Sequence, residues 1–402
     1  MNAVGIDVSK GKSMIAVMRP FGEVVASPYE VRHTADELEK LASFLKSLNG
    51  ETRVVMEYTG RYYQPIARFL HEAGLFVSVV HAQLIHNYGN NTIRKVKTDK
   101  KDAVKIANYA LTNWLELREY APEDDVRLLL KTCSRQYNQY MKLKTMLKNN
   151  LIALLDQTFP GVNTLFAGPP RKADGHEKWV DFAATFWHCQ CVCGQSENAF
   201  KERYRKWCVR TGYHYRDGKA GDIYAAACGH VNTLPKSDCT KLLIIQAVAQ
   251  INSASETLAA VLQEMRRLAA MLPEYPVVVS MYGVGETLGP QLIAEIGDVR
   301  RFAGKGSLVS YAGVEAPPFQ SGSFESSERS ISKQGPPALR KALFQVMSVI
   351  LQNSPADEPV FQFLDRKRAE RKPYCVYMVA GCNKFLRIYY ARVKQHLNSL
   401  GC

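Results

Sequence analysis

The spacing of apolar residues changes along the chain and divides it into regions. Over residues 1–115, short apolar runs alternate with stretches in which apolar side chains recur every three to four positions. The first pattern is typical of β-strands and the second of helices that bury one face. Three successive runs, at 3–9, 13–18 and 23–27, predict an antiparallel meander. Helices and strands alternate after the meander, which is the element order of an α/β RNase H-like fold.

The pattern becomes helical from residue 126 onward. Apolar residues recur in alternating steps of four and three over 126–154, where Lys144 is the charged interruption, and again over 244–272. Sustained heptads predict a coiled coil. We therefore expect a helical coiled-coil stalk whose two runs pair either antiparallel within the chain or between subunits. Residues 156–240, rich in Gly, Cys and aromatic side chains, predict a small helical insertion at the stalk tip.

These changes place domain boundaries near residues 115 and 275. The predicted domains are an α/β domain at 1–115, the stalk with its insertion at 116–275, and a mostly α-helical domain at 276–402. In the last domain, a turn containing Gly283 and Gly285 opens a predicted helix. Such a turn offers backbone N–H groups to a phosphate. A plain connection between two helices explains the same residues equally well.

Four acidic residues in the first quarter of the chain suggest metal chemistry. Asp7 and Glu57 lie at or near the ends of two apolar strands, and Asp99 and Asp102 have the i, i+3 spacing that puts both on one face of a helix. Carboxylates in such an arrangement can hold one or two Mg²⁺ ions against a phosphodiester. Surface salt bridges alone would leave the positions of Asp7 and Glu57 on apolar strands unexplained.

The charge balance indicates a nucleic-acid partner. The formal net charge is +14, and Lys and Arg displace condensed counterions from phosphates. A merely basic protein is the alternative. The residues assigned to nucleic-acid contact are Arg94, Lys95, Lys97, Lys100 and Lys101 around the acidic pair, Gly283 and Gly285 in the turn, and Arg329, Lys333, Arg340, Arg366 and Arg368 farther along the chain.

The cysteines and the N-terminus say less about function than the charge does. Cys189, Cys191 and Cys193 lack the repeated pairs of a structural zinc site, so reduced thiols are the favoured interpretation and metal binding stays open. The N-terminus does not resemble a signal peptide, and no apolar run approaches the ~18 residues of a membrane span. We expect a cytoplasmic protein at the bacterial nucleoid, without membrane contact.

A second candidate for chemistry is the Pro-, Gly- and Ser-rich segment at 311–335, which predicts a loop. Ser321 precedes Gly322 in this segment, so its hydroxyl should be accessible. Nearby cations could stabilise an attacking alkoxide and the phosphate that it meets. Composition alone favours a simpler interpretation, in which these serines are only solvated.

Taken in combination and order, these motifs resemble the IS110 family of insertion-sequence transposases, which are bridge-RNA-guided serine recombinases. The resemblance covers essentially the whole chain. An acidic D-E-D-D quartet of a RuvC-like domain matches Gly5-Ile6-Asp7, Met56-Glu57-Tyr58 and Thr98-Asp99-Lys100-Lys101-Asp102. The C-terminal transposase domain matches Tyr282-Gly283-Val284-Gly285, Ala294-Glu295-Ile296-Gly297-Asp298, Tyr311-Ala312-Gly313, Gln320-Ser321-Gly322 and Ser332-Lys333-Gln334-Gly335.

The resemblance implies a mechanism that the residues alone do not. Ser321 would attack DNA and form a covalent link, and the quartet would position the reacting phosphate through Mg²⁺. Pro317 is displaced by one position from the family pattern, which makes Ser323 the alternative nucleophile. A bridge RNA would pair with donor and target DNA. The family works as dimers that assemble into tetramers.

Other functions fit parts of the pattern. A RuvC-like junction nuclease would use the acids with water and need no serine. A non-catalytic nucleic-acid scaffold would need neither. An actin-like sugar kinase also begins with a Gly-x-Asp strand, but it needs a second Gly-rich phosphate loop that this chain lacks.

Overall fold

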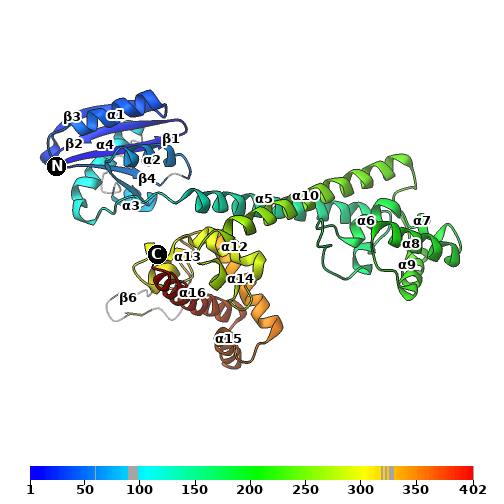
Figure 1. Cartoon of the computed structure of the whole chain (residues 1–402). Helices are drawn as coiled ribbons and strands as arrows, with labels where there is room; N and C mark the ends of the chain where they lie inside the picture. The colour runs from blue at the N-terminus through cyan, green and yellow to red at the C-terminus, as the bar shows by residue number, and fades with distance from the viewer. Residues whose placement is uncertain (59, 89–97, 318–319, 322–323, 326–329, 402) are drawn as a thin grey trace. The chain divides into compact units, whose positions relative to one another are not determined.

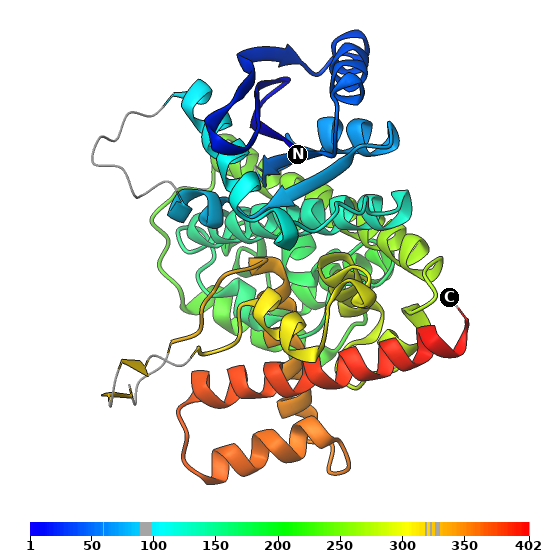
Figure 2. The ribbon, with the colours of Figure 1, turned by 90° about the vertical axis from the view of Figure 1, so that its left-hand side faces the viewer.

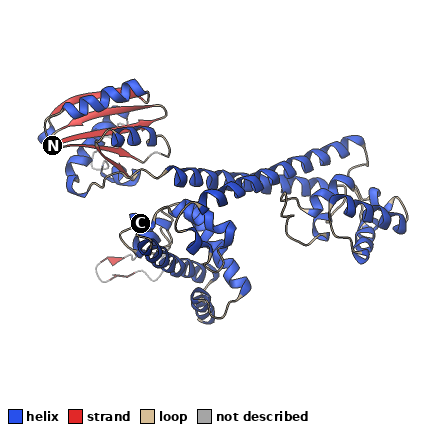
Figure 3. Ribbon diagram, viewed as in Figure 1, coloured by secondary structure: helices blue, strands red, loops and turns tan. Residues whose placement is uncertain are grey.

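The computed structural model describes residues 1–402 apart from 59, 89–97, 318–319, 322–323, 326–329 and 402. The chain folds into two compact units, Met1–Pro122 and Glu123–Cys402 (Figure 1). The first combines a sheet with helices, and the second is almost entirely helical (Figure 3). None of the helices in the described ranges is long and apolar enough to cross a membrane.

A five-stranded mixed sheet forms the centre of the first unit, with strand order β3-β2-β1-β4-β5. The strands are β1 (Asn2–Ser9), β2 (Lys12–Met18), β3 (Val24–Arg32), β4 (Thr52–Glu57) and β5 (Phe76–Val80). β2 is antiparallel to β1 and β3, whereas β4 is parallel to β1 and to β5. The predicted meander and the mixed sheet that follows it fit an RNase H-like domain.

Helices cover both faces of this sheet because its central strands are apolar on both sides. The helices of this unit are α1 (Ala35–Ser47), α2 (Gln64–Glu72), α3 (Ala82–Tyr88) and α4 (Asp99–Thr112). Val4 and Ile6 of β1 share one apolar cluster with α1 and α2. Ala3 of β1 and Val55 of β4 share the opposite cluster with α4. The odd-numbered residues of β1 and β4 therefore face α4.

Two long helices, α5 (Asp125–Leu155) and α10 (Asp238–Ala270), lie side by side within the second unit (Figure 1). Near the start of α5, Leu130 shares a cluster with Met265 near the end of α10. Near the end of α5, Leu151 shares another with Ile244 near the start of α10. The two helices thus pair antiparallel within one chain, which was one of the two predicted arrangements. Coiled-coil geometry itself stays a prediction.

Lys144, the charged residue in the predicted apolar seam, is buried. Its Nζ donates to the carbonyl oxygen of Gly175 at 3.2 Å and lies 3.2 Å from a carboxylate oxygen of Glu177. Gly175 has a φ of +73°, and a Cβ there would lie 3.2 Å from the carbonyl oxygen of Ser255 on α10. A loop of the insertion therefore folds back against the helix pair, and it supplies the partners that a buried lysine needs.

The insertion has its own core between α5 and α10. Its elements are a 3₁₀ turn (Val162–Leu165), α6 (Lys178–Thr185), α7 (Gln190–Cys193), α8 (Glu197–Thr211) and α9 (Asp217–Gly229). The core is aromatic: Phe182 stacks on Phe186 with ring centroids 4.5 Å apart, and both are fully buried. Cys191 and Cys208 are buried in the same cluster. All cysteines in the described part of the chain are free thiols.

The rest of the second unit packs six further helices around another core. They are α11 (Tyr275–Val279), α12 (Gly285–Ile296), α13 (Lys305–Ala312), α14 (Pro337–Asn353), α15 (Pro359–Ala369) and α16 (Tyr374–Ser399). Figure 2 shows α16 running alongside α15. A Cβ at Gly381 would lie 2.5 Å from the Leu364 side chain, so glycine at this position lets the two helices pack closely. Arg127 of α5 forms a buried ion pair with Glu274, which ties the helix pair to this core.

Candidate active site

Asp7 and Glu57 lie at neighbouring ends of two central strands. β1 and β4 are parallel, and their last paired positions are Ile6 and Met56. Asp7 and Glu57 follow directly, so the two residues sit at the same level on strands about 4.8 Å apart. Both are half-buried, and both interact with other groups of the protein. The parallel register thus brings together two carboxylates that are far apart in the sequence.

Both carboxylates also lie on the same face of the sheet. Side chains of a strand alternate between its two faces. Ala3 and Val55 pack in the cluster that contains α4, and Asp7 and Glu57 each follow one of them by an even number of positions. Asp7 and Glu57 therefore belong to the face that α4 covers.

A glycine lets α4 approach this face closely. A Cβ at Gly5 would lie 2.1 Å from the carbonyl oxygen of Ala103 and 2.4 Å from the backbone nitrogen of Ala107. Any larger residue would therefore collide with the backbone of α4. Glycine inside a strand often marks such a close approach. Gly5 precedes Asp7 by two positions, so the contact lies directly beside the acidic end of the strand.

The direction of α4 places the other two acids at the same end. Ala110, near the end of the helix, packs in the cluster with Ala3 at the start of β1, while the middle of the helix lies over Gly5. α4 therefore runs opposite to β1, and its first turn lies toward Asp7. Asp99 and Asp102 are both in that first turn. All four predicted acids thus gather at one end of one sheet face.

The start of α4 is defined by a capping residue. The hydroxyl oxygen of Thr98 accepts a hydrogen bond from the backbone nitrogen of Lys101 at 3.3 Å. Lys100 and Lys101 are exposed on the same turn. Acids in a first turn are favoured by the helix dipole, so the helix end tolerates its two carboxylates. Three predicted contact residues, Arg94, Lys95 and Lys97, lie outside the described residues.

The four acidic residues lie toward the same end of the sheet face, but their side chains do not form a metal-binding cluster. Among the described residues, no three His, Cys, Asp or Glu side chains are close enough together to hold a metal ion. The quartet is therefore a set of oxygen donors on one face, held by two strands and a helix. Its members would have to converge around a cation by side-chain rotation.

Ser321 lies in the second unit, on a short hairpin. β6 (Gln320–Ser321) pairs antiparallel with β7 (Phe324–Glu325), with Ser321 opposite Phe324. The predicted loop is therefore folded into a hairpin at this point. The alternative nucleophile Ser323 and the predicted contact Arg329 lie outside the described residues.

The base of this loop is tightly closed. A Cβ at Gly335 would lie 1.9 Å from the carbonyl oxygen of Tyr311, and one at Gly313 would lie 2.6 Å from that of Gln334. The Arg340 guanidinium donates to the carbonyl oxygens of Ala312 at 3.3 Å and Gly335 at 3.0 Å. Arg340, predicted as a nucleic-acid contact, therefore also joins the two ends of the serine loop.

The other predicted contacts are distributed over the second unit. Gly283 and Gly285 both have positive φ values, +79° and +55°, in the turn that opens α12. A Cβ at Gly283 would contact α14, whereas none of the described atoms lies within 4 Å of one at Gly285. Lys333, with φ of +54°, is exposed, as are Arg366 and Arg368 on α15. The turn therefore has free space beside Gly285, whereas α14 fills the space beside Gly283.

One buried acid was not among the predicted site residues. Glu295 on α12 is 2% exposed, and the guanidinium of Arg135 lies 4.0 Å from its carboxylate. Burial raises the pKa of the Glu295 carboxyl, against the lowering effect of Arg135. The Tyr311 hydroxyl donates to the backbone carbonyl of Glu295 at 3.0 Å, which links α12 to α13 at the base of the serine loop. The sequence carries only a weak signal for this role, an acid inside an apolar helix.

Comparison with known proteins identifies the family. Residues 4–160 match a transposase family model described as DEDD_Tnp_IS110, and residues 275–361 match the model of the transposase IS116/IS110/IS902 family. The pilin gene-inverting protein of Moraxella bovis is 24% identical, over 85% of this chain and 80% of its own length. The 44.8 kDa protein of insertion element IS116 from Streptomyces clavuligerus is 24% identical over 79% and 77%. The 43.6 kDa protein of IS110 from Streptomyces coelicolor is 21% identical over 97% and 93%.

Two solved structures resemble part of the chain. The RuvC structure of Thermus thermophilus aligns with 29% of this chain and 96% of its own, with a TM-score of 0.22 and 14% identity. The same RuvC in complex with a Holliday junction substrate aligns over the same shares, with a TM-score of 0.23 and 11% identity. The assignment rests on the two family models and the curated relatives. The chain belongs to the IS110 family of transposases, and it is a DNA-recombining enzyme.

Proposed function

We propose that this transposase cuts and rejoins DNA at a composite site. Asp7, Glu57, Asp99 and Asp102 form its acidic half, and Ser321 supplies the nucleophile. The observation that carries the proposal is the placement of four acidic residues, on two strands and a helix, toward one end of one sheet face. Salt bridges on a protein surface do not require such an arrangement.

The acidic half suits a hard divalent cation. All four donors are carboxylates, with no His or Cys among them, and this oxygen set favours Mg²⁺ over softer metals. One or two bound Mg²⁺ ions would neutralise charge on the reacting phosphodiester. The backbone contact at Gly5 fixes the distance between the helix and the strand that carry the ligands. The protein itself therefore sets how closely Asp7 can approach Asp102.

The nucleophilic half supplies a covalent step. The Ser321 oxygen attacks a backbone phosphorus of DNA and forms a phosphodiester with the protein. The phosphorus–oxygen bond to one deoxyribose breaks, and that oxygen takes up the proton that the serine loses. Rejoining is the reverse reaction with a new DNA hydroxyl, so no external energy source is needed. The closed base at Gly313 and Gly335 supports a defined position for the hairpin.

We further propose that the active form is an assembly with nucleic acid. The acids and the serine lie in different units of the chain, and a second copy could supply one half to the other as dimers assemble into tetramers. A structured bridge RNA encoded by the element would pair with donor and target DNA and so choose the sequences. The net charge of +14 suits binding of both polyanions.

The decisive experiment compares three variants on labelled DNA that carries the ends of the element. Ser321→Ala should abolish the protein–DNA adduct and recombination, whereas Ser323→Ala, as the matched control, should retain both. Asp102→Asn should also abolish recombination, with its melting temperature unchanged. Normal strand cleavage by Ser321→Ala would refute the serine mechanism. Sequencing of RNA copurified with the native protein tests the guide separately, and absence of any RNA from the element would refute it.

A RuvC-like junction nuclease without a covalent intermediate is the alternative, and it is not favoured. Such a nuclease would need only the first unit, whereas the family match extends over residues 275–361 of the second. The adduct experiment separates the two mechanisms, because hydrolysis by water leaves no DNA on the protein.

A further inference from the structure

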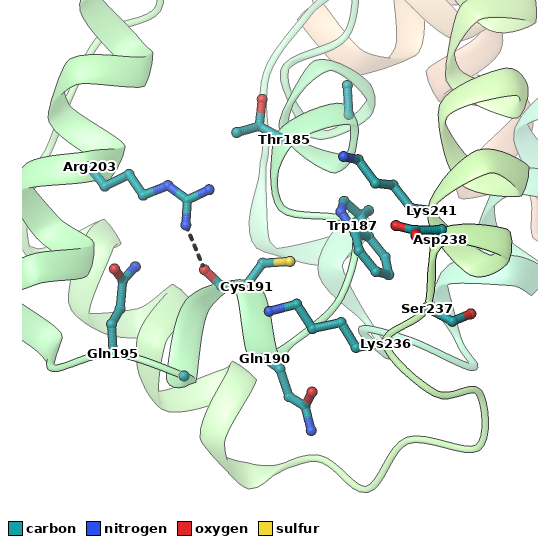
Figure 4. A pocket seen from close by; sticks show the side chains of 12 residues that line it. Thr185, Trp187, Gln190, Cys191, Gln195, Arg203, Lys236, Ser237, Asp238 and Lys241 are labelled. Carbon is teal, nitrogen blue, oxygen red and sulfur yellow. Dashed lines mark hydrogen bonds between the residues drawn. The ribbon is translucent and has the colours of Figure 1, made fainter.

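The insertion contains a basic pocket for which the transposase mechanism has no use. The pocket has a volume of about 880 Å³, which is within the usual range for ligand sites. It lies between the end of α6, the segment with α7, α8 and the start of α10, and Figure 4 shows its lining. The acidic quartet belongs to the other unit and the serine hairpin does not line it, so the pocket is a separate feature of the chain.

Three cations reach this pocket from two sides. Arg203 projects from α8, and Lys236 and Lys241 project from the opposite wall (Figure 4). Asp238 is the single carboxylate among the lining residues. Within the described ranges, none of the three cations has a carboxylate within the 4.0 Å of an ion pair, whereas Lys201 on the same helix α8 pairs with Glu197 at 3.0 Å. With three cations against one carboxylate, the pocket lining carries an excess of positive charge.

The floor of the pocket adds no negative charge. The Arg203 guanidinium donates to the backbone carbonyl of Cys191 at 3.3 Å, which orients it at the floor. Burial raises the pKa of the Cys191 thiol, against the lowering effect of Lys236, so the thiol stays neutral.

The start of α10 strengthens the preference for an anion. Ser237 caps this 33-residue helix, and its hydroxyl oxygen accepts from the backbone nitrogen of Thr240 at 3.3 Å. The positive end of the helix dipole therefore lies in the same wall of the pocket as Lys236 and Lys241. The Trp187 indole, 7% exposed, contributes an apolar wall. Cations, the start of a helix and one apolar wall suit a phosphate joined to an organic group.

We propose that this pocket binds a backbone phosphate of an unpaired nucleic-acid strand. A recess can admit a nucleotide that leaves the stack, whereas the backbone of a regular duplex is held on a surface. RNA and DNA share this phosphate chemistry, and the experiment separates them. The inference concerns strand binding alone, so it survives if the serine mechanism fails.

The test measures binding of the full-length protein to a single-stranded oligonucleotide, made once as RNA and once as DNA, by fluorescence anisotropy over a series of salt concentrations. The double variant Lys236→Gln/Lys241→Gln removes two pocket charges. The matched control, Lys206→Gln/Arg210→Gln, removes two exposed charges from α8 outside the pocket. Each lost phosphate contact lowers the salt dependence of single-strand binding by about 0.7 in log–log slope. Loss of the one phosphate held in the pocket should therefore lower the slope by about 0.7 in the pocket variant and by much less in the control.

If the pocket variant loses more of its salt slope with the RNA oligonucleotide, the pocket binds RNA; if it loses more with the DNA oligonucleotide, the pocket binds DNA. Equal losses in the pocket variant and the control would overturn the proposal, because they would reflect net charge alone. An unchanged slope in the pocket variant would also overturn it, as would a greater loss with a duplex of the same sequence. Melting curves of both variants verify that they are folded. The charge reversal Lys241→Glu provides a second test, because it should weaken binding further.

Discussion

Substitution of Gly5 by alanine should move the helix that carries half of the acidic quartet. The added Cβ would lie 2.1 Å from the Ala103 carbonyl oxygen and 2.4 Å from the Ala107 nitrogen. Carbon atoms pack at about 3.5 Å or more, so α4 has to retreat from β1 by roughly 1 Å. Both contacts are with backbone, so rotation of a side chain cannot relieve them. Asp99 and Asp102, in the first turn of α4, move with the helix.

The expected cost has a structural and a catalytic part. Overpacking of a close-packed core costs about 1–3 kcal/mol, and Ala103, Ile106 and Ala107 are fully buried at this interface. For a unit of this size we expect the melting temperature to fall by about 10 °C. A displacement of about 1 Å in a positioning group can lower activity roughly 100-fold. Recombination below the melting transition should therefore drop far more than the folded fraction.

Calorimetry and a recombination assay at a temperature where the variant is folded would measure the two parts. Gly306→Ala is the control, because none of the described atoms lies within 4 Å of its Cβ and its φ is not positive. We expect it to melt like the native protein. Adding Ala107→Gly to Gly5→Ala should rescue little, since the shortest contacts are with backbone. Native stability and activity in Gly5→Ala would refute the account of how α4 is positioned.

Three further predictions concern the second unit. Glu177→Leu should destabilise it by about 3 kcal/mol in urea unfolding, because Lys144 is left buried without its carboxylate, and adding Lys144→Met should recover most of the loss. The Arg171 hydrogen bond holds the pKa of Asp174 at about 2, below the ordinary 3.8. Its contribution is present above pH 3.8 and is lost as the pH falls toward 2, so Asp174→Asn should flatten acid unfolding in that window. Arg340→Ala should loosen the serine loop, seen as faster proteolysis there, with adduct formation reduced.

The positions of the four acids in the fold could be predicted because local rules dictate the elements that carry them. Apolar runs ended at or near Asp7 and Glu57, and a spacing of three joined Asp99 to Asp102. The parallel register of β1 and β4 then brought the strand ends together. The close contact at Gly5 was not predicted, because a glycine in a strand has several explanations and only the position of α4 selects one.

Other features depend on contacts that no local pattern encodes. In the sequence, Lys144 only interrupts a run of apolar positions. Its partners, which explain why it can be buried, lie on a loop of the insertion. The walls of the basic pocket come from α8 and from the start of α10, separated by the whole of α9. Single lysines on exposed helix turns are normal, and only their convergence on one recess distinguishes Lys236 and Lys241. Such sites become visible when the tertiary fold is known.

The two halves of the candidate site are held by different kinds of contact, and this bears on how they would act. The acids lie on two central strands and on a helix locked by a backbone contact at Gly5. Ser321 lies on a hairpin of two-residue strands whose base is closed by Gly313, Gly335 and Arg340. Strands and a helix packed this closely can hold the phosphate in one place, and the closed base of the loop can hold the hairpin for attack on it. Under the proposed mechanism, cleavage would therefore depend on DNA that both halves hold at once.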